Sequence, residues 1–311
     1  MSFPFPLLRL PRLVLCEVFK SLNIGEKIKL SICSKKVSTQ INYCRLYSQK
    51  VHVHLDMYSN KIEVSENGED KFKIFNWSVS VIKTNRQQYQ IEGRTVSVIS
   101  YNKGINAFWE NDQKGFLSVL RYLSKIFQCK FLISDNYKYD SYEKTISELF
   151  DLQVEFKILT ICLNGSKDEN LLWNLISSNF GLVEDLRISS SFNSGFRPVF
   201  TSWPQKIYIM SSAWFTPKYL LTCTTCTTIS LEGSLLENND LDETLWKWQT
   251  GGFPNLEFMK ILSHNITNNG TTILGMKLRE LNRLVIQTND GSKKATIKTG
   301  YGRIEMSVTP F

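Results

Sequence analysis

Apolar residues recur every three to four positions near the start of the chain. The recurring residues are Leu10, Val14, Leu15, Val18 and Leu22. This spacing places one apolar stripe on a helix. The helix is predicted to start at Pro11, because proline fits the first helical turn, and to end within "SLNIGE", at Asn23 and Gly25.

A second helix is predicted directly afterwards. Ile28, Leu30 and Ile32 form its apolar part, Ser34 to Lys36 lie on its polar side, and Val37 and Ile41 continue it. The segment therefore predicts a compact helical hairpin or trihelical unit of about forty residues. Units of this size bury little surface and usually need a partner for stability.

Alternation with a period of two follows in residues 51–110. The phrase "VHVHLDMYSNKIEVSENGEDKFKIFNW" alternates and is broken by "NGED", and "QYQIEGRTVSVISY" turns at Gly93. This pattern predicts a small β-meander. From Gly115, "GFLSVLRYLSKIFQ" predicts a helix whose apolar stripe contains Phe116, Leu117, Leu120, Leu123 and Phe127.

Short strand-like phrases then recur through residues 115–311. Their central apolar residues are Phe131, Leu159, Leu186, Ile207, Ile229, Met259 and Leu284, at intervals of 28, 27, 21, 22, 30 and 25 residues. Leucine-rich repeats have one strand per 20–29 residues. Helix-like stretches such as "ENLLWNLISSNFG" and "LDETLWKWQTGGFP" lie between the phrases. The predicted fold class is therefore α/β, an irregular leucine-rich-repeat-like solenoid that ends in a hairpin, "DGSKKATIKTGYGRIEMSV". The regular Asn or Cys ladder is missing, so an irregular two-layer α/β domain is the alternative.

A solenoid would bind partners on its concave, strand-lined side. Alternation predicts that the exposed positions are Asp185, Arg187 and Ser189, then Lys206, Tyr208 and Met210, then Thr228, Ser230 and Glu232. Arg187, Tyr208, Met210 and Ser230 are the predicted target-binding residues. The alternative is that this face is covered by the meander or is inert surface.

Charge is concentrated at the start of the chain. The net charge is +8, and the first fifty residues carry nine Lys or Arg against Glu17 and Glu26. The near-neutral remainder argues against a nucleic-acid surface spread over the molecule. The excess predicts an acidic partner or a solvated face, and the candidates are Lys20, Lys27, Lys29, Lys35 and Lys36.

Compartment follows from what the sequence lacks. It has neither a signal-peptide pattern nor the roughly 20 uncharged apolar residues of a membrane helix, so no membrane association is expected. Seven cysteines, an odd number without a tight framework, predict free thiols in a reducing compartment, the cytoplasm or nucleus. Sequons at Asn76, Asn164, Asn265 and Asn269 are expected to be chance matches.

Few residues suggest chemistry. Cys223 and Cys226 have metal-ligand spacing but lack a second ligand pair, and His52 and His54 share one strand face with only His264 elsewhere. Two small buried cysteines and an ordinary strand face are the favoured interpretations. Trp246 and Trp248 could form a binding patch, although one of the two is expected in the core. Nucleophile, phosphate-loop and cofactor motifs are lacking, so neither catalytic residues nor cofactors are expected.

The opening segment resembles an F-box. "LPRLVLCEVFKSLNIGEKIKLSICSKKV" has a Leu-Pro start, apolar residues at the matching positions and a Cys-Ser-Lys-Lys stretch, with Val37 where many F-boxes have Trp. "FPLLRLP" looks like the nematode-type proteins in particular. The resemblance implies that residues 1–45 bind a Skp-type adaptor and, through it, a cullin. The expected adaptor-binding residues are Leu10, Pro11, Val14, Val18, Leu22, Ile28 and Leu30. The alternative is a small helical cap on the larger domain.

The end of the chain resembles the F-box-associated domain of the same proteins. The matching phrases are "NNDLDETLWKWQTGGFPNLEFMKI" and "DGSKKATIKT...IEMSV". Residues 46–311 are therefore predicted to select a target protein. The expected function is a non-catalytic substrate-recognition subunit of an SCF-type ubiquitin ligase. The alternatives are an adaptor-bound scaffold without a ligase role and an enzyme with an unrecognised site.

Overall fold

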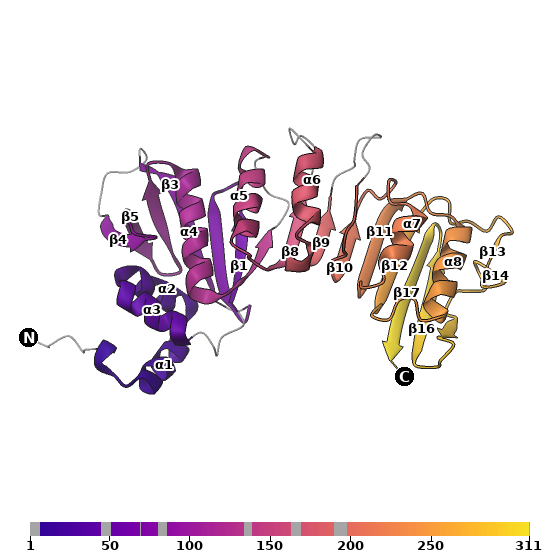
Figure 1. Ribbon diagram of the computed structural model, residues 1–311, viewed down its shortest axis with the longest axis horizontal. Coiled ribbons are helices and arrows are strands. Elements are labelled where there is room, and N and C mark those ends of the chain that lie inside the picture. Colours follow the sequence, from indigo (N-terminus) through magenta and orange to yellow (C-terminus); the bar gives the residue numbers. More distant parts are fainter. Residues whose placement is uncertain are drawn as a thin grey trace, which may run out of the picture. The chain divides into compact units, whose positions relative to one another are not determined.

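The computed structural model describes residues 7–44, 51–68, 70–79, 86–133, 139–162, 169–189 and 198–310. The chain folds as two compact units, unit 1 with residues Met1–Phe156 and unit 2 with residues Lys157–Phe311. The predicted boundary near residue 45 falls inside unit 1. Figure 1 shows both units coloured along the sequence.

Unit 1 begins with the expected trihelical arrangement. A short 3-10 helix, η1 (Leu7–Arg9), precedes α1 (Arg12–Ser21), α2 (Ile24–Cys33) and α3 (Lys35–Cys44). The second predicted helix is therefore two helices. Ser34 has an extended backbone, with φ −156° and ψ 125°, which ends α2, and its carbonyl accepts from the Ser38 N–H to begin α3. Serine is favoured at the position that precedes a helix, so Ser34 is a sequence signal for the boundary between α2 and α3.

The sheet of unit 1 is not the simple meander that alternation predicts. Its strands are β1 (Val51–Asp56), β2 (Lys61–Glu66), β3 (Lys71–Ser78), β4 (Gln87–Ile91), β5 (Arg94–Tyr101), β6 (Gly104–Trp109) and β7 (Lys130–Ile133). Their order is β7-β1-β2-β3-β6-β5-β4. The pairing of β3 with β6 is parallel, as is that of β1 with β7. The two hairpin turns, at "NGED" and Gly93, lie where predicted.

Helices complete unit 1. The predicted helix after Gly115 is α4 (Asp112–Phe127), and all five residues of its predicted apolar stripe are buried. It contacts β3 and β6, while α2 contacts β2, β3 and β4 and α3 contacts α4. The N-terminal helices are therefore packed into unit 1 (Figure 1). A further helix, α5 (Tyr139–Asp151), follows β7.

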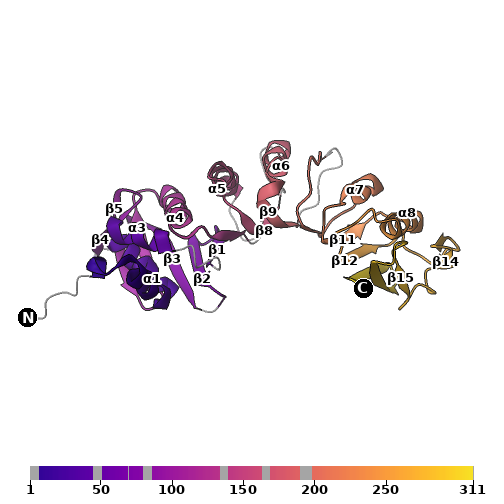
Figure 2. The same cartoon turned by 60° about the horizontal axis from the view of Figure 1, so that its bottom comes forward.

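Unit 2 alternates strands with helices, as the repeating phrases predict. Its strands are β8 (Phe156–Ile161, which starts one residue earlier), β9 (Val183–Ile188), β10 (Lys206–Ile209), β11 (Thr228–Ser234) and β12 (Phe258–Ser263). Between them lie α6 (Glu169–Ser177), η4 (Phe180–Leu182), α7 (Pro217–Thr222) and α8 (Asn238–Gln249). Figure 2 shows α6, α7 and α8 on one side of these strands.

The register of the central strands agrees with the repeat intervals. Leu186, Ile207, Ile229 and Met259 stand opposite one another across the parallel strands β9 to β12. All four are buried. Because these residues are equivalent positions of the predicted repeats, the sequence interval marked the true register in this part of the chain. The solenoid itself stays a prediction.

The last predicted repeat is wrong. Leu284 precedes β15 (Val285–Gln287), which pairs antiparallel with β16 (Lys293–Gly300). The predicted terminal hairpin is β16 with β17 (Arg303–Pro310), and β17 pairs antiparallel with β12. A small ribbon, β13 (Thr272–Ile273) with β14 (Met276–Lys277), precedes them. The parallel series therefore ends at β12.

Two further expectations concern cysteines and membranes. Cys16 and Cys44 form a disulfide, so the prediction of free thiols throughout the chain is wrong for these two residues. The other cysteines, Cys33, Cys129, Cys162, Cys223 and Cys226, carry thiols. None of the helices in the described part of the chain is long and apolar enough to cross a membrane.

Candidate functional site

The predicted apolar stripe of α1 does not face the core of unit 1. The helix buries Leu15, Cys16 and Phe19 instead. Only Leu15 belongs to the predicted stripe, because the buried arc is rotated toward Cys16 and Phe19. The rest of the stripe lies at the edge of the core or in solvent.

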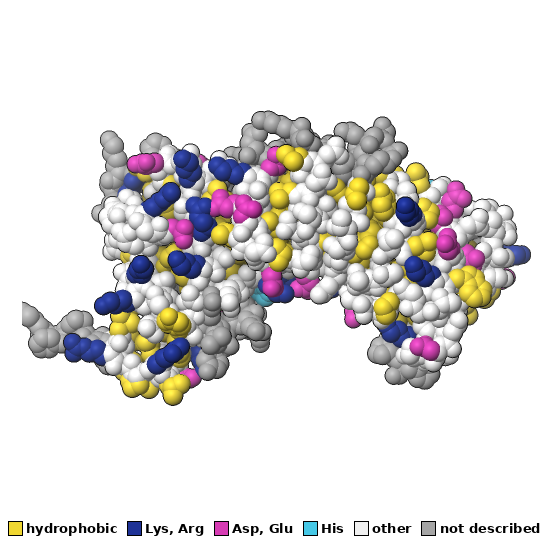
Figure 3. Space-filling view, in the orientation of Figure 1, with side chains coloured by type: hydrophobic (Ala, Val, Ile, Leu, Met, Phe, Trp, Pro, Cys, Tyr) yellow, Lys and Arg dark blue, Asp and Glu magenta, His cyan; other side chains and the backbone are white. Residues whose placement is uncertain are grey.

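Exposed apolar side chains gather on α1 and the end of α3. Leu13 is 79% exposed and Val14 is 46% exposed, and Leu8 on η1 and Tyr43 on α3 are exposed as well. We call these four residues the α1 surface. Figure 3 shows hydrophobic side chains gathered over α1 at the lower left, between basic ones. The guanidinium of Arg12 lies over the Tyr43 ring, 5.2 Å from its centroid, and connects the two helices.

The seven predicted adaptor-binding residues divide into three groups. Pro11 and Val14 are exposed. The half-buried group is Leu10, Val18, Leu22 and Leu30. Ile28 is 1% exposed and belongs to the core of the domain itself. Sequence reasoning missed Leu8, Leu13 and Tyr43, because they lie outside the predicted helical stripe. Only their exposure in the structure marks them, since clustered exposed apolar residues indicate interaction sites.

Helix α2 is fixed to the sheet of unit 1 by its lysines. Lys27 is buried, and its Nζ lies 2.7 Å from Oε2 of Glu66 on β2. Lys29 Nζ donates to the Tyr101 carbonyl at 2.8 Å. These two lysines hold the fold together and are not the free charges that the sequence suggested. Lys35 and Lys36 are exposed, as predicted.

Helix α4 holds both α2 and α3. The Tyr122 hydroxyl donates to Ser31 Oγ at 2.9 Å, and the Asn42 amide donates to the Lys125 carbonyl at 3.0 Å. Burial raises the pKa of Tyr122 to about 12, so this hydroxyl keeps its proton at physiological pH. α2 and α3 therefore form a fixed base for α1.

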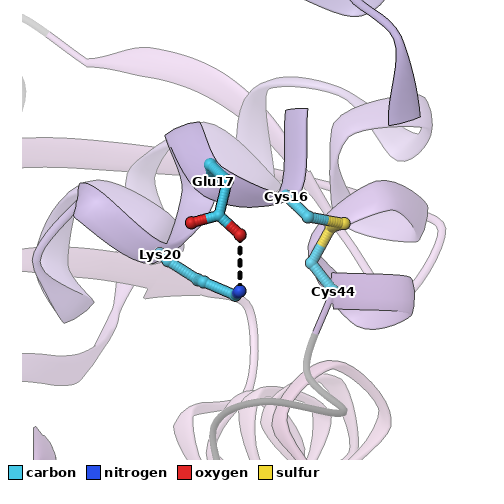
Figure 4. Close-up of a disulfide and its surroundings, with 4 residues drawn as sticks. All are labelled: Cys16, Glu17, Lys20 and Cys44. Carbon is cyan, nitrogen blue, oxygen red and sulfur yellow. Dashed lines mark hydrogen bonds and ion pairs between the residues drawn. A yellow bond between two sulfur atoms is a disulfide. The ribbon is translucent and has the colours of Figure 1, made fainter. Parts of the chain in front are cut away.

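The Cys16–Cys44 disulfide joins α1 to α3 (Figure 4). The two Cα atoms are 5.2 Å apart and both residues are buried. On the exposed side of α1, Lys20 Nζ pairs with Glu17 at 2.6 Å, within the helix (Figure 4). The disulfide thus attaches the helix that carries Leu13 and Val14 of the α1 surface to the fixed base.

A second candidate site lies on the face of the unit 2 strands opposite α6, α7 and α8. Arg187, Tyr208, Ser230 and Lys260 align across β9 to β12, as the predicted register requires. The Arg187 guanidinium lies 5.3 Å from the Tyr208 ring centroid. It also donates to Asp185 at 2.9 Å, and this hydrogen bond raises the pKa of Arg187.

The predicted exposure of this face is wrong at three positions. Asp185, Thr228 and Ser230 are buried, with Ser230 only 6% exposed. Short side chains beside long ones on flanking strands are covered by them, and Ser230 lies between Tyr208 and Lys260. Arg187 is exposed as predicted, and Tyr208 is half-buried.

Apolar residues are exposed in or directly after three adjacent strands. Met210, which was predicted, is 61% exposed, and Leu235 and Leu262 are exposed as well. Met210 follows β10, Leu235 follows β11 and Leu262 lies in β12, and these strands are neighbours in the sheet. Sequence reasoning missed Leu235 because the register of β11 shifts between Leu231 and Ser234.

The remaining candidates for chemistry have structural explanations. Cys223 and Cys226 are buried, and their thiols donate to the carbonyls of Tyr219 and Pro204. Burial raises the pKa of Cys223, which keeps this thiol protonated. Trp248 is in the core and Trp246 is 53% exposed, as predicted for one of the pair.

The histidine pair and the sequons are the remaining motifs. Nδ1 of His54 lies 3.9 Å from Oε2 of Glu63 on the neighbouring strand. Asn76 is buried, which excludes glycan attachment in the folded state, whereas Asn265 and Asn269 are exposed and Asn164 lies outside the described residues. Within the described ranges, histidines, cysteines and carboxylates nowhere form a cluster of three that could hold a metal.

Comparison with known proteins assigns the N-terminal helices. Residues 7–49 match the family described as F-box domain. Neither the curated proteins nor the solved structures contain a match to this chain. The matched residues include η1, α1, α2 and α3, and three of these elements, η1, α1 and α3, carry the α1 surface. An F-box implies binding to a Skp-type adaptor of SCF-type ubiquitin ligases and, through it, to a cullin. The chain therefore carries an F-box domain at residues 7–49.

Proposed function

We propose that this protein is a non-catalytic substrate-recognition subunit of an SCF-type ubiquitin ligase. The F-box match at residues 7–49 carries the proposal. It is supported by the outward-facing apolar side chains of α1, which the core of unit 1 leaves exposed. The ligase would act inside the cell, in the cytoplasm or nucleus. The resemblance of residues 238–261 to the nematode-type F-box-associated domain fits a target-selecting role for unit 2.

The α1 surface is the proposed contact with the adaptor. Exposed apolar anchors near the centre of an interface carry most of its binding energy, at about 2 kcal/mol or more each. Leu13 and Val14 project from a helix that rests on the fixed base of α2 and α3. Such a rigid platform reduces the ordering cost of association.

The adaptor proposal is tested with Val14→Asp, a change at an exposed position that leaves the core intact. We expect co-purification of a recombinant Skp-type adaptor to fall at least tenfold, because a carboxylate would be desolvated in the interface. Leu152→Ala is the matched control, since Leu152 in unit 1 has similar exposure. If Val14→Asp binds like wild type while the control also binds, the adaptor contact lies elsewhere. Detection of the cullin in the same complex separates a ligase subunit from a scaffold.

The open sheet face of unit 2 is the proposed target site. Arg187 and Tyr208 form its polar part, with Ser230 on the floor between longer side chains, and Met210 gives it an apolar, adaptable edge. Leu262, exposed on the neighbouring part of β12, adds a further apolar side chain. Aromatic residues, Met and Arg are enriched at protein interfaces.

The target proposal is tested by affinity capture with Tyr208→Ser combined with Met210→Asp. Ser230 is left unchanged, because a charged side chain at this buried position would lose its hydration. We expect partners that are captured by wild type to be lost, while adaptor binding and cooperative melting are kept. Tyr301→Ser is the control, because Tyr301 is fully exposed in the β16–β17 turn. Unchanged capture of every partner by the double variant would place the target site elsewhere.

A further inference from the structure

Helix α1 depends on tertiary contacts for its position. It has ten residues, fewer than the roughly 12–15 that an isolated helix needs in water. Its N-cap residue is Pro11, which makes no side-chain capping hydrogen bond. Two polar contacts of its side chains, Lys20 to Glu17 and Ser21 to the Val18 carbonyl, stay within the helix. Attachment to unit 1 therefore rests largely on the face that contains Leu15, Cys16 and Phe19.

The disulfide is the covalent part of that attachment. Cys16 and Cys44 are 28 residues apart in sequence, so the bond closes a loop that contains all of α2. Its α3 end is fixed, because Asn42, two residues before Cys44, is hydrogen-bonded to α4. Its α1 end lies between Leu15 and Glu17, one turn from Leu13 and two residues from Val14. The bond therefore limits how far the α1 surface can move from α3.

We propose that Cys16 and Cys44 form a reversible redox site that sets the affinity of the α1 surface for its adaptor. This inference rests on the proposed function. In the oxidised form, α1 is held on α3 with Leu13 and Val14 presented together with Tyr43. In the reduced form, α1 is held only by noncovalent contacts, which include those of Leu15 and Phe19 and the Arg12–Tyr43 contact. A helix that is docked for only part of the time binds its partner with an apparent affinity reduced by that fraction.

The chemistry is thiol–disulfide exchange with a cellular thiol such as glutathione. Both sulfurs are buried, so exchange proceeds when α1 opens locally from α3. A glutathione thiolate then attacks one sulfur, the S–S bond breaks, and the released cysteine thiolate takes a proton. A second glutathione thiolate then attacks the mixed disulfide and releases the other cysteine. Two thiols of the protein and one oxidised glutathione result, so two electrons and two protons pass to the protein. The reverse reaction uses oxidised glutathione as the oxidant.

Thermodynamic linkage connects adaptor binding to the redox equilibrium of the disulfide. If the oxidised form binds the adaptor more tightly, then bound adaptor must favour the oxidised form by the same factor. Two independent measurements, affinity as a function of redox state and redox state as a function of adaptor, must therefore agree. A disulfide with only a structural role in a domain that stays docked would change neither quantity.

The experiment measures the dissociation constant of the full chain for a recombinant Skp-type adaptor, after equilibration in oxidised or reduced glutathione. We expect the oxidised protein to bind about fivefold or more tightly than the reduced protein. Cys16→Ser with Cys44→Ser should bind like the reduced wild type in both buffers. Cys33→Ser is the matched control, since Cys33 is a free, exposed thiol of the same domain and should leave the redox response unchanged. Alkylation and mass spectrometry then give the oxidised fraction with and without adaptor.

The outcomes are distinct. Tight binding that is equal in both redox states, or tighter when reduced, overturns the redox inference and leaves the adaptor proposal in place. Absence of binding in both redox states overturns the adaptor proposal and this inference with it. The comparison of redox states in the wild type needs no variant, so misfolding of the double serine variant would not remove the test.

Discussion

Gly25 is a position of close contact between α2 and the sheet of unit 1. A Cβ atom at this position would lie 2.6 Å from Cδ2 of the Phe72 ring, closer than real Cβ contacts allow. Lys29, one turn later, places its ammonium 5.8 Å from the centroid of the same ring. The absence of a side chain at residue 25 therefore lets the F-box pack directly against β3.

Replacing Gly25 by alanine should destabilise unit 1. Alanine gains about 1 kcal/mol of helix propensity, but overpacking costs about 1–3 kcal/mol, and the Phe72 ring is itself buried, which limits its movement. Urea unfolding should show the net loss. Combining the change with Phe72→Leu should recover part of it as a favourable coupling energy. Gly181→Ala, where a Cβ meets nothing within 4 Å, should change stability little. Additive effects of Gly25→Ala and Phe72→Leu would mean that the close contact has no energetic weight.

At the scale of elements, periodicity predicts which segments become helices and strands but not always which side faces inward. The repeat intervals located β9 to β12 and even their register, because a buried apolar residue must recur at each strand. In α1 periodicity located the apolar stripe of Leu10, Val14, Val18 and Leu22, which is predicted to bind the adaptor. It did not identify Cys16 and Phe19, which lie outside the stripe and are buried with Leu15. An interface-forming helix carries apolar residues on more than one side, so periodicity alone cannot separate core from docking surface.

Burial by neighbours explains the errors on the sheet of unit 2. Alternation correctly assigned Arg187 and Ser230 to one face, yet exposure there depends on side-chain length. Asp185 is buried beside its longer ion-pair partner Arg187, two residues along the same strand, while the Arg187 side chain itself stays exposed. The Cys16–Cys44 bond was missed because spacing in sequence does not show which helix ends meet.

The strand β2 carries an element-scale prediction about pH. Burial raises the pKa of Glu63, but Lys61, Lys71 and Lys73 lower it by more, and the net shift is downward. A carboxylate with a lowered pKa in the folded state contributes stability above its unfolded pKa, near 4.3, and this contribution is lost as pH falls through the folded value. Glu63→Gln should therefore cost about 1 kcal/mol at pH 7 and progressively less below about pH 4.5.

Urea unfolding between pH 3 and pH 7 measures this difference. Glu155→Gln is the control, because Glu155 is largely exposed and pairs with a single exposed lysine, Lys130. A stability difference between wild type and Glu63→Gln that stays constant over this pH range would contradict the assigned role of the β2 network.

At the scale of the molecule, the F-box is packed into unit 1. Lys27 pairs with Glu66, Tyr122 donates to Ser31, and Gly25 contacts Phe72, so the helices and the sheet share one buried core. A division near residue 45 would expose apolar residues of β2 and β3 that α2 now covers, including Phe72. Deleting residues 1–45 is therefore expected to disturb the core of unit 1 as well as to remove the adaptor contact.

Deletion of residues 1–45 should destabilise unit 1 in addition to abolishing adaptor binding. We expect amide hydrogen exchange across residues 61–78 to lose most of its protection, because exposing several core side chains costs about 1.5–3 kcal/mol for each. Val14→Asp should lose the adaptor with protection intact, since residue 14 is on the outer side of α1. Wild-type protection of β2 and β3 in the truncated chain would show instead that the F-box is a separable domain with its boundary near residue 45. That outcome would make the truncation a valid way to separate adaptor partners from target partners. If protection is lost as expected, the separation must rely on point variants of the α1 surface, because a partially unfolded unit 1 would capture proteins nonspecifically through its exposed core.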